Sequence, residues 1–109
     1  MVQVALEINP PINYVEALRD FGWKIKFQHL RPFVGSQKDE LMSIGDIRLF
    51  GMQSRLLPYG GLTICSAKKV VNGSVIEVKA EAHCNKSDKY QRKTGNNLAS
   101  KRLWEFLHE

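Results

Sequence analysis

The sequence has little cysteine and no long apolar run, and each absence excludes a class of protein. Only two of its 109 residues are cysteines, which in a reducing compartment stay as thiols. No apolar run approaches the roughly 20 residues that a membrane-spanning helix needs. The N-terminal segment 2–8 is too short for a signal peptide and contains Glu7. We therefore expect a single domain over residues 1–109, located in the cytoplasm and not bound to a membrane.

Catalytic and metal-binding patterns are also missing. The chain has no Gly-x-Ser-x-Gly or Gly-x-x-x-x-Gly-Lys motif, and no Cys-x-x-Cys or His-x-x-x-His spacing. His83 and Cys84 are adjacent on an expected strand, so their side chains point to opposite faces and cannot easily share one metal ion. His29 lies at the end of a strand with no acid to orient it. We expect no catalysis, no metal and no cofactor, and we interpret both cysteines as small core residues.

Positive charge is in excess, and it is concentrated near the C-terminus. Lys and Arg number 16 against 11 Asp and Glu, which gives a formal net charge of +5. Between residues 86 and 102 several cations are opposed only by Asp88. These cations are Lys86, Lys89, Arg92, Lys93, Lys101 and Arg102. Such clustering is typical of a surface that binds nucleic acid, nucleotide phosphates or an acidic protein, although it also occurs on helices that are basic only for solubility.

Alternation and capping residues predict the elements of the N-terminal part. Apolar and polar residues alternate over 2–8, which predicts a strand that the following Asn-Pro-Pro ends. Asn13 with Glu16 resembles a capping box, and we predict a short helix over 13–21. A second alternation over 23–29 predicts another strand.

Segment 34–60 has no clear periodicity. A short helix capped at Ser36 could extend through Met42, and Pro58 with Tyr59 indicates a turn. We interpret this segment as an insertion, a lid or an interaction loop.

Asn72-Gly73 between two β-rich runs predicts a tight hairpin whose paired residue numbers sum to 145. One face of this hairpin then carries small and mostly apolar residues. They are Thr63, Cys65, Ala67, Val78, Ala80 and Ala82. The other face is polar and places Lys68 opposite Glu77 as an ion pair. The register also keeps the two cysteines apart, so we expect no disulfide.

The last helix is predicted to begin near Ser87 or Asp88 and to end at residue 107. One stripe of it faces the sheet and comprises Gly95, Ala99, Leu103 and Phe106. We expect Gly95 to allow close approach of the helix to the sheet. Arg102 is expected to find a carboxylate or a phosphate, or to extend to the edge of the fold. Trp104 is expected to project away from the stripe as a contact for a partner or a second subunit. The predicted fold is α+β, with a small antiparallel sheet of three to four strands packed against a C-terminal helix and a short N-terminal helix.

The candidate site is segment 85–97, which leads from the sheet into the start of the last helix. Free N–H groups and the positive end of the helix dipole favour anions at such a position. Basic side chains there can contact phosphates, and a tyrosine can stack on a base. The candidate phosphate- or partner-binding residues are Lys86, Lys89, Tyr90, Arg92, Lys93, Asn96 and Arg102.

Segment 84–88, Cys-Asn-Lys-Ser-Asp, with the pattern Arg-Lys-x-Gly-x-x-Leu-Ala-x-x-Arg-Leu over 92–103, resembles the C-terminal signature of small phage- and prophage-encoded accessory proteins. In those proteins a hairpin leads through a Cys-x-x-x-Asp turn into an Arg-Lys-x-Gly helix. The resemblance covers 60–107 and implies a phage setting, and hence the cytoplasm of the host cell. Phage proteins of this size often serve counter-defence, by binding a host complex or by sequestering a signalling nucleotide.

The order helix, three strands, helix also resembles a double-stranded RNA-binding domain, in which cations at the start of the second helix grip phosphates. Segment 92–96, Arg-Lys-Thr-Gly-Asn, stands where that family has Lys-Lys-x-Ala-Lys, whereas segments 2–8 and 34–60 depart from its pattern. We expect a non-catalytic binding protein that engages nucleic-acid or nucleotide phosphates. The alternative is a protein inhibitor of a host enzyme or defence complex that acts through the same basic face or through segment 34–60.

Overall fold

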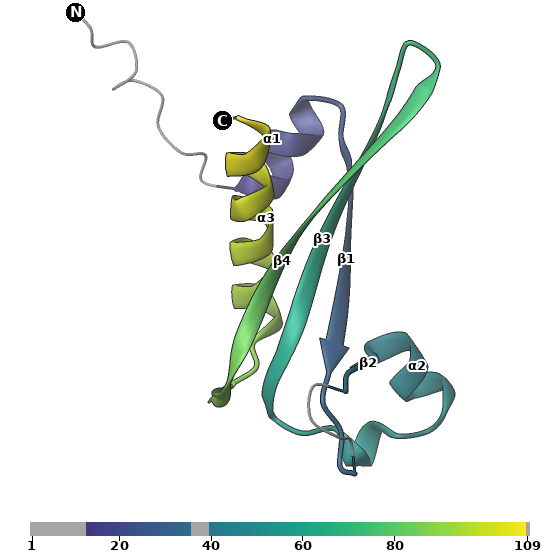
Figure 1. Cartoon of the computed structure of the whole chain (residues 1–109), viewed down its shortest axis with the longest axis vertical. Helices are drawn as coiled ribbons and strands as arrows, with labels where there is room; N and C mark the ends of the chain where they lie inside the picture. The colour runs from purple at the N-terminus through teal and green to yellow at the C-terminus, as the bar shows by residue number, and fades with distance from the viewer. Residues whose placement is uncertain (1–12, 36–39, 109) are drawn as a thin grey trace, which may run out of the picture.

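The computed structural model describes residues 13–35 and 40–108, and in it helices α1 and α3 pack on one face of a four-stranded antiparallel sheet (Figure 1). The strands lie in the order β2-β1-β3-β4. In chain order the elements are α1 (Tyr14–Asp20), β1 (Lys24–Arg31), β2 (Met42–Ser43), α2 (Ile44–Leu49), the 3-10 helix η2 (Gln53–Arg55), β3 (Tyr59–Val71), β4 (Ser74–Lys89) and α3 (Arg92–Leu107). This is the predicted α+β fold; the strand predicted over 2–8 lies outside the described residues.

Helix α1 forms because Asn13 caps its first turn. The Asn13 Oδ1 accepts a hydrogen bond from the Glu16 N–H at 3.1 Å, which satisfies one of the free amide donors at the helix start. Leu18 faces the sheet and is fully buried. The short N-terminal helix is therefore confirmed, and the strand predicted over 23–29 is β1.

Strands β3 and β4 form a long hairpin with the predicted register. From the turn down to Gly61 and Cys84, the numbers of the paired residues sum to 145. Asn72 has φ 52° and Gly73 has φ 79°, the two positive angles that a two-residue turn of this kind requires. The turn thus sets which side chains of the hairpin share a face.

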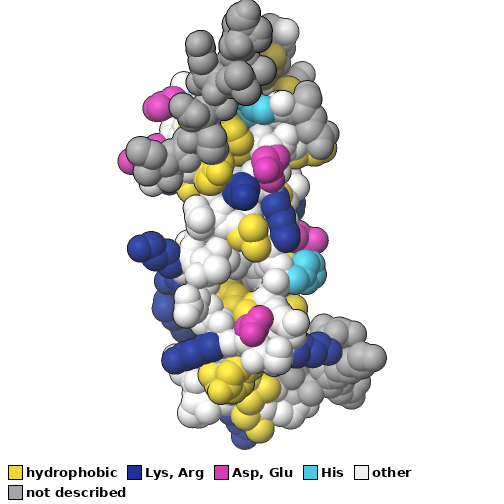
Figure 2. Space-filling model, turned by 90° about the vertical axis from the view of Figure 1, so that its left-hand side faces the viewer, with side chains coloured by type: hydrophobic (Ala, Val, Ile, Leu, Met, Phe, Trp, Pro, Cys, Tyr) yellow, Lys and Arg dark blue, Asp and Glu magenta, His cyan; other side chains and the backbone are white. Residues whose placement is uncertain are grey.

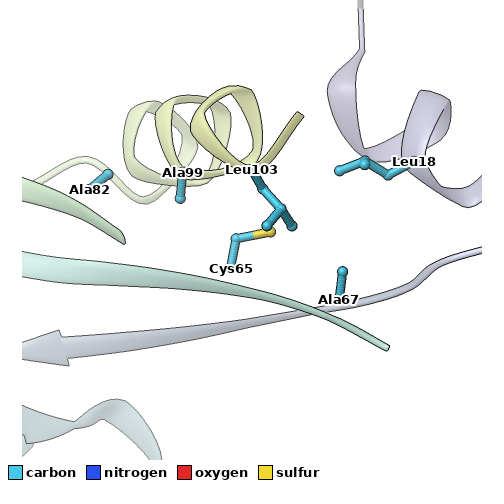
Figure 3. Packing of buried hydrophobic residues seen from close by; sticks show 6 residues of the cluster. All are labelled: Leu18, Cys65, Ala67, Ala82, Ala99 and Leu103. Carbon is cyan, nitrogen blue, oxygen red and sulfur yellow. The ribbon is translucent and has the colours of Figure 1, made fainter. Parts of the chain in front are cut away.

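The hydrophobic core lies between this hairpin and the two helices. Its buried members are Cys65 and Ala67 of β3, Ala82 of β4, Ala99 and Leu103 of α3, and Leu18 of α1. Figure 3 shows Leu103 pointing from α3 toward Cys65, with Leu18 reaching in from α1. The strands contribute small side chains, which let α3 lie close to the sheet. Gly95 allows the same close approach in the first turn of α3, where a Cβ atom at this position would overlap the Thr63 Oγ1. The prediction for Gly95 is confirmed.

Two predictions for the end of α3 are wrong. Phe106, predicted on the stripe that faces the sheet, is 58% exposed, and Leu107 packs against the core instead. Trp104 does not project away from the fold, because its ring centroid lies 6.4 Å from that of Tyr14 and 6.0 Å from that of Phe21. The reason is that α1 packs beside the last turns of α3, so the side chains of α3 that face α1 are covered there.

The segment after β1 does not form a helix that reaches Met42. Residues 36–39 lie outside the described residues, and Met42 belongs to β2, which pairs with Arg31 at the end of β1. Helix α2 begins at Ile44, directly after β2. Its cap is Ser43, whose Oγ accepts a hydrogen bond from the Asp46 N–H at 3.1 Å. Strand pairing therefore takes Met42, which a capping pattern alone would assign to a helix.

Candidate nucleic-acid interface

The junction between β4 and α3 differs from the prediction. Strand β4 continues to Lys89, and α3 begins only at Arg92. Beyond an irregularity in the ladder, Tyr59 at the start of β3 pairs with Lys89, so the backbone there is still engaged in the sheet. The predicted helix start at Ser87 or Asp88 is wrong for this reason, and Tyr59 lies in a strand rather than in a turn.

The Cys-x-x-x-Asp turn is held by its own short polar groups. The Cys84 thiol donates to the backbone oxygen of Asp88 at 3.4 Å, and the Asn85 Oδ1 accepts from the Ser87 N–H at 3.1 Å. Together with the first turn of α3, this segment borders a hollow of about 300 Å³. Both cysteines are free thiols, in separate places. The signature residues here shape the connection between the last strand and the last helix.

Tyr90 and Asn96 belong to a polar cluster inside the fold. The Tyr90 hydroxyl shares a 2.7 Å hydrogen bond with the Thr63 Oγ1, and the Arg31 guanidinium lies 4.0 Å from the centroid of the Tyr90 ring. The Asn96 Oδ1 lies 2.7 Å from the Nε2 of His29. Arg31 covers one face of the Tyr90 ring, so the structure does not present this ring as a free stacking surface, and we remove Tyr90 and Asn96 from the candidate surface.

Burial and neighbouring cations control the protonation of this cluster. Burial lowers the pKa of His29, and the charges of Arg92 and Arg31 lower it further, so that the imidazole is neutral and its Nε2–H donates to the Asn96 Oδ1. Burial raises the pKa of Tyr90, which keeps its hydroxyl protonated. His29 and Asn96 are 67 residues apart in the chain, so neither local periodicity nor motif spacing could join them.

Arg102 connects α3 to the sheet. Its Nη1 donates to the backbone oxygen of Glu81 on β4 at 2.8 Å. We expected this guanidinium to find a carboxylate or a phosphate or to extend to the edge, and the structure shows an exposed side chain whose partner is a backbone carbonyl. We assign Arg102 a packing role.

The remaining cations of the candidate site border different hollows. Lys89 borders the hollow beside the Cys84 turn, Arg92 borders a hollow on the β1 side, and Lys93 borders one beside α1. Lys86 is exposed and lies beside Gly60. In the view of Figure 2, Lys and Arg side chains stand in separate groups with uncharged and apolar surface between them. The junction therefore does not gather its cations on one surface.

A second basic surface lies on the sheet face opposite helices α1 and α3. The strand register places its side chains in two neighbouring cross-strand rows. The rows are Lys24, Lys68 and Glu77, then Lys26, Ser66 and Lys79. The Lys68 Nζ lies 3.8 Å from the Glu77 Oε2, which confirms the predicted ion pair. We call the four lysines of these rows the basic sheet face. The polar side of each strand was predicted from the sequence, but the adjacency of these sides was not, because it depends on the pairing of β1 with β3.

The basic sheet face continues into a hollow of about 660 Å³ along β1. Arg48 of α2 and Arg92 of α3 line this hollow together with the four lysines. Glu77 is the only acidic side chain among the described residues that line it, and it is already engaged in the ion pair. The lining includes side chains from both faces of β1, so the hollow follows the edge of that strand, with the four lysines on one side and Arg92 of α3 on the other. Six cations and one carboxylate therefore border this hollow, and Arg92 is the one residue of the sequence-predicted site among them.

Other classes of site find no direct support. Across 13–35 and 40–108, no three His, Cys, Asp or Glu side chains gather closely enough to hold a metal ion. None of the described helices combines the length and the apolar character needed to cross a membrane. Compared with known proteins, the chain matches no family model, no curated protein and no solved structure.

Proposed function

We propose that this chain is a non-catalytic binding protein that engages the phosphates of a nucleic acid, and that the basic sheet face with Arg48 and Arg92 is its contact surface. The observation that carries the proposal is the hollow lined by six cations and a single, already paired carboxylate. A concave surface on which cations outnumber carboxylates six to one creates a positive potential that attracts polyanions. A nucleic-acid backbone supplies several phosphates at once, which a surface of this extent can contact together.

Two features of the fold support a nucleic acid as the partner. With β2, α2 and η2 inserted between β1 and β3, the elements α1, β1, β3, β4 and α3 follow the order on which the resemblance to a double-stranded RNA-binding domain rests. The lysines lie on paired strands about 4.8 Å apart, in rows about 7 Å apart, so their positions are held by the sheet rather than by a flexible loop. In the resemblance the helix start holds the phosphates, whereas four of the six cations here, the lysines, lie on the opposite face of the sheet, and the experiments below separate these two surfaces.

The first test is the dependence of binding on salt. If four to six phosphates are neutralised, affinity for a duplex should fall about 100- to 1000-fold between 50 and 200 mM salt. Fluorescence anisotropy with a labelled 20-base-pair duplex measures this slope, and a mononucleotide added as competitor shows whether one phosphate group is enough. No binding at 50 mM salt would overturn the proposal.

The second test compares two variants with the same change in charge. Lys26→Glu with Lys79→Glu alters the basic sheet face, and Lys89→Glu with Lys93→Glu alters the junction; all four side chains are exposed. We expect the first pair to lower affinity about 100-fold and the second pair at least about tenfold less. An equal or larger loss in the second pair would place the phosphates at the start of α3 and overturn the assignment to the sheet.

The alternative, inhibition of a host protein, predicts a different outcome. The same positive surface can dock on an acidic protein. Copurification from a host lysate after nuclease treatment separates the two, because a nucleic-acid complex is lost and a protein complex survives. A protein retained by the wild-type chain and released by Lys26→Glu with Lys79→Glu, in the absence of duplex binding, would replace the proposed function by this alternative.

A further inference from the structure

The β3–β4 hairpin extends beyond the rest of the fold as a two-stranded arm (Figure 1). Among the described residues, the last pair that includes β1 is Lys24 with Lys68, so residues 69–76 pair only with each other. We call residues 69–76 the hairpin arm. Its three residue pairs above the sheet add about 10 Å of length at the usual rise of a strand.

The end of the arm is apolar and exposed. Val70 and Val75 lie opposite each other in the register, and each is 67% exposed. Val71 and Ile76 are also exposed. The register places Val70 and Val75 on one face of the arm and Val71 and Ile76 on the other. None of the four belongs to the buried core, and exposed apolar side chains on a projecting element mark a contact site.

The charged row next to this tip shows which partner fits it. The row directly below the Val70–Val75 pair, on the same face of the sheet, holds Lys24, Lys68 and Glu77, so it carries a net positive charge after the Lys68–Glu77 ion pair. An apolar tip above a row of net positive charge matches a duplex groove, whose rim carries phosphates and whose floor carries the methyl groups of thymine. A second copy of the chain would bring the same lysines together, and their like charges would repel.

We propose that the hairpin arm enters the major groove of duplex DNA, with Val70 and Val75 against the base edges and the basic sheet face on the flanking phosphates. This inference rests on the proposed function and specifies its ligand. The major groove of B-form DNA is about 12 Å wide and 8.5 Å deep, so it admits a two-stranded ribbon, and an arm of about 10 Å reaches its floor. The major groove of A-form RNA is deep and too narrow for side chains to read, so an RNA duplex can bind only through its phosphates.

The experiment compares three labelled duplexes of one thymine-rich sequence: DNA, DNA with deoxyuridine in place of thymidine, and RNA. The variants are Val70→Ser with Val75→Ser, and as a matched control Val34→Ser with Leu49→Ser, which removes exposed apolar side chains far from the arm. The wild-type chain and the control should bind the DNA about tenfold more tightly than the RNA, with the deoxyuridine duplex between them. The tip variant should bind DNA as weakly as RNA, while its affinity for RNA stays within about twofold of wild type.

The outcomes separate this inference from the proposed function. If no duplex binds, the proposed function itself fails. If DNA and RNA bind equally to the wild-type chain, or if the tip variant keeps the preference for DNA, the nucleic-acid proposal stands and the arm does not enter the groove. Circular dichroism must show that the tip variant keeps its fold, as expected for exposed positions. Valine-dependent binding to anionic phospholipid vesicles, or a dimer that the tip variant loses, would assign the arm to a different partner and overturn the inference.

Discussion

Gly95→Ala tests the close contact between α3 and the sheet. Alanine is favoured over glycine in a helix interior by about 1 kcal/mol, so in an isolated helix the change would stabilise. Here the new Cβ would overlap the Thr63 Oγ1 and lie 3.2 Å from the Thr63 Cβ. Thr63 is fully buried, and its hydroxyl shares the 2.7 Å hydrogen bond with Tyr90, so it cannot move without breaking that bond.

The expected magnitude follows from these opposing terms. Overpacking a core costs about 1–3 kcal/mol and a lost hydrogen bond about 1 kcal/mol, so after the gain of about 1 kcal/mol in helix propensity the free energy of unfolding should fall by about 1–3 kcal/mol. Urea titration followed by circular dichroism measures it, and Tm should fall by about 4–24 °C. Thr63→Ala removes the overlapping oxygen, so in that background Gly95→Ala should cost at least about 1 kcal/mol less. A Gly95→Ala protein that is more stable than wild type would refute the close approach of α3 to β3.

Three further predictions concern the buried cluster, the thiols and the turn. Because the pKa of His29 is held below its ordinary value of 6.5, the unfolded chain binds a proton that the folded chain does not, so the free energy of unfolding should decrease as the pH falls below about 6.5. Urea titrations from pH 7.5 to 5 measure this decrease, which should be smaller in His29→Gln. A pH dependence that is unchanged in His29→Gln would contradict the lowered pKa of His29. Cys65 is fully buried and burial raises its pKa to about 11, so a thiol reagent at pH 8 should modify only Cys84 in the native protein and both cysteines after unfolding; rapid modification of both would mean that the core is open. Gly73→Ala should lower the free energy of unfolding by about 1–2 kcal/mol, because φ 79° is strained for a residue with a Cβ; a neutral result would argue against this turn.

Local chemistry accounts for the parts of the fold that sequence analysis predicted correctly. A two-residue turn with two positive φ angles leaves one register for the strands beside it, so Asn72-Gly73 was enough to predict the pairs and the Lys68–Glu77 ion pair. The Asn13 cap likewise acts within three residues and was sufficient to predict α1. These features depend on neighbours a few positions apart or on pairing that one turn dictates.

The candidate site depended on contacts between distant segments, and there the predictions were weakest. Strand pairing with Tyr59 moved the start of α3 to Arg92, and packing of α1 covered Trp104, although nothing near these residues in the chain signals either event. Lys89 and Lys93 therefore border different hollows, although the clustering of charge in the sequence had suggested that they share one face.

Residue patterns along the chain were sufficient to predict the α+β class, the hairpin with its register, the small apolar face and the excess of positive charge. The place where that charge is presented follows instead from how the strands pair and the helices pack. Lys24 and Lys68 are 44 positions apart in the numbering, yet the pairing of β1 with β3 makes them neighbours on one exposed face. Periodicity and turn geometry act over a few residues, whereas a surface is assembled by strand pairing and helix packing across the whole chain, and for that reason its composition cannot be obtained from local patterns alone.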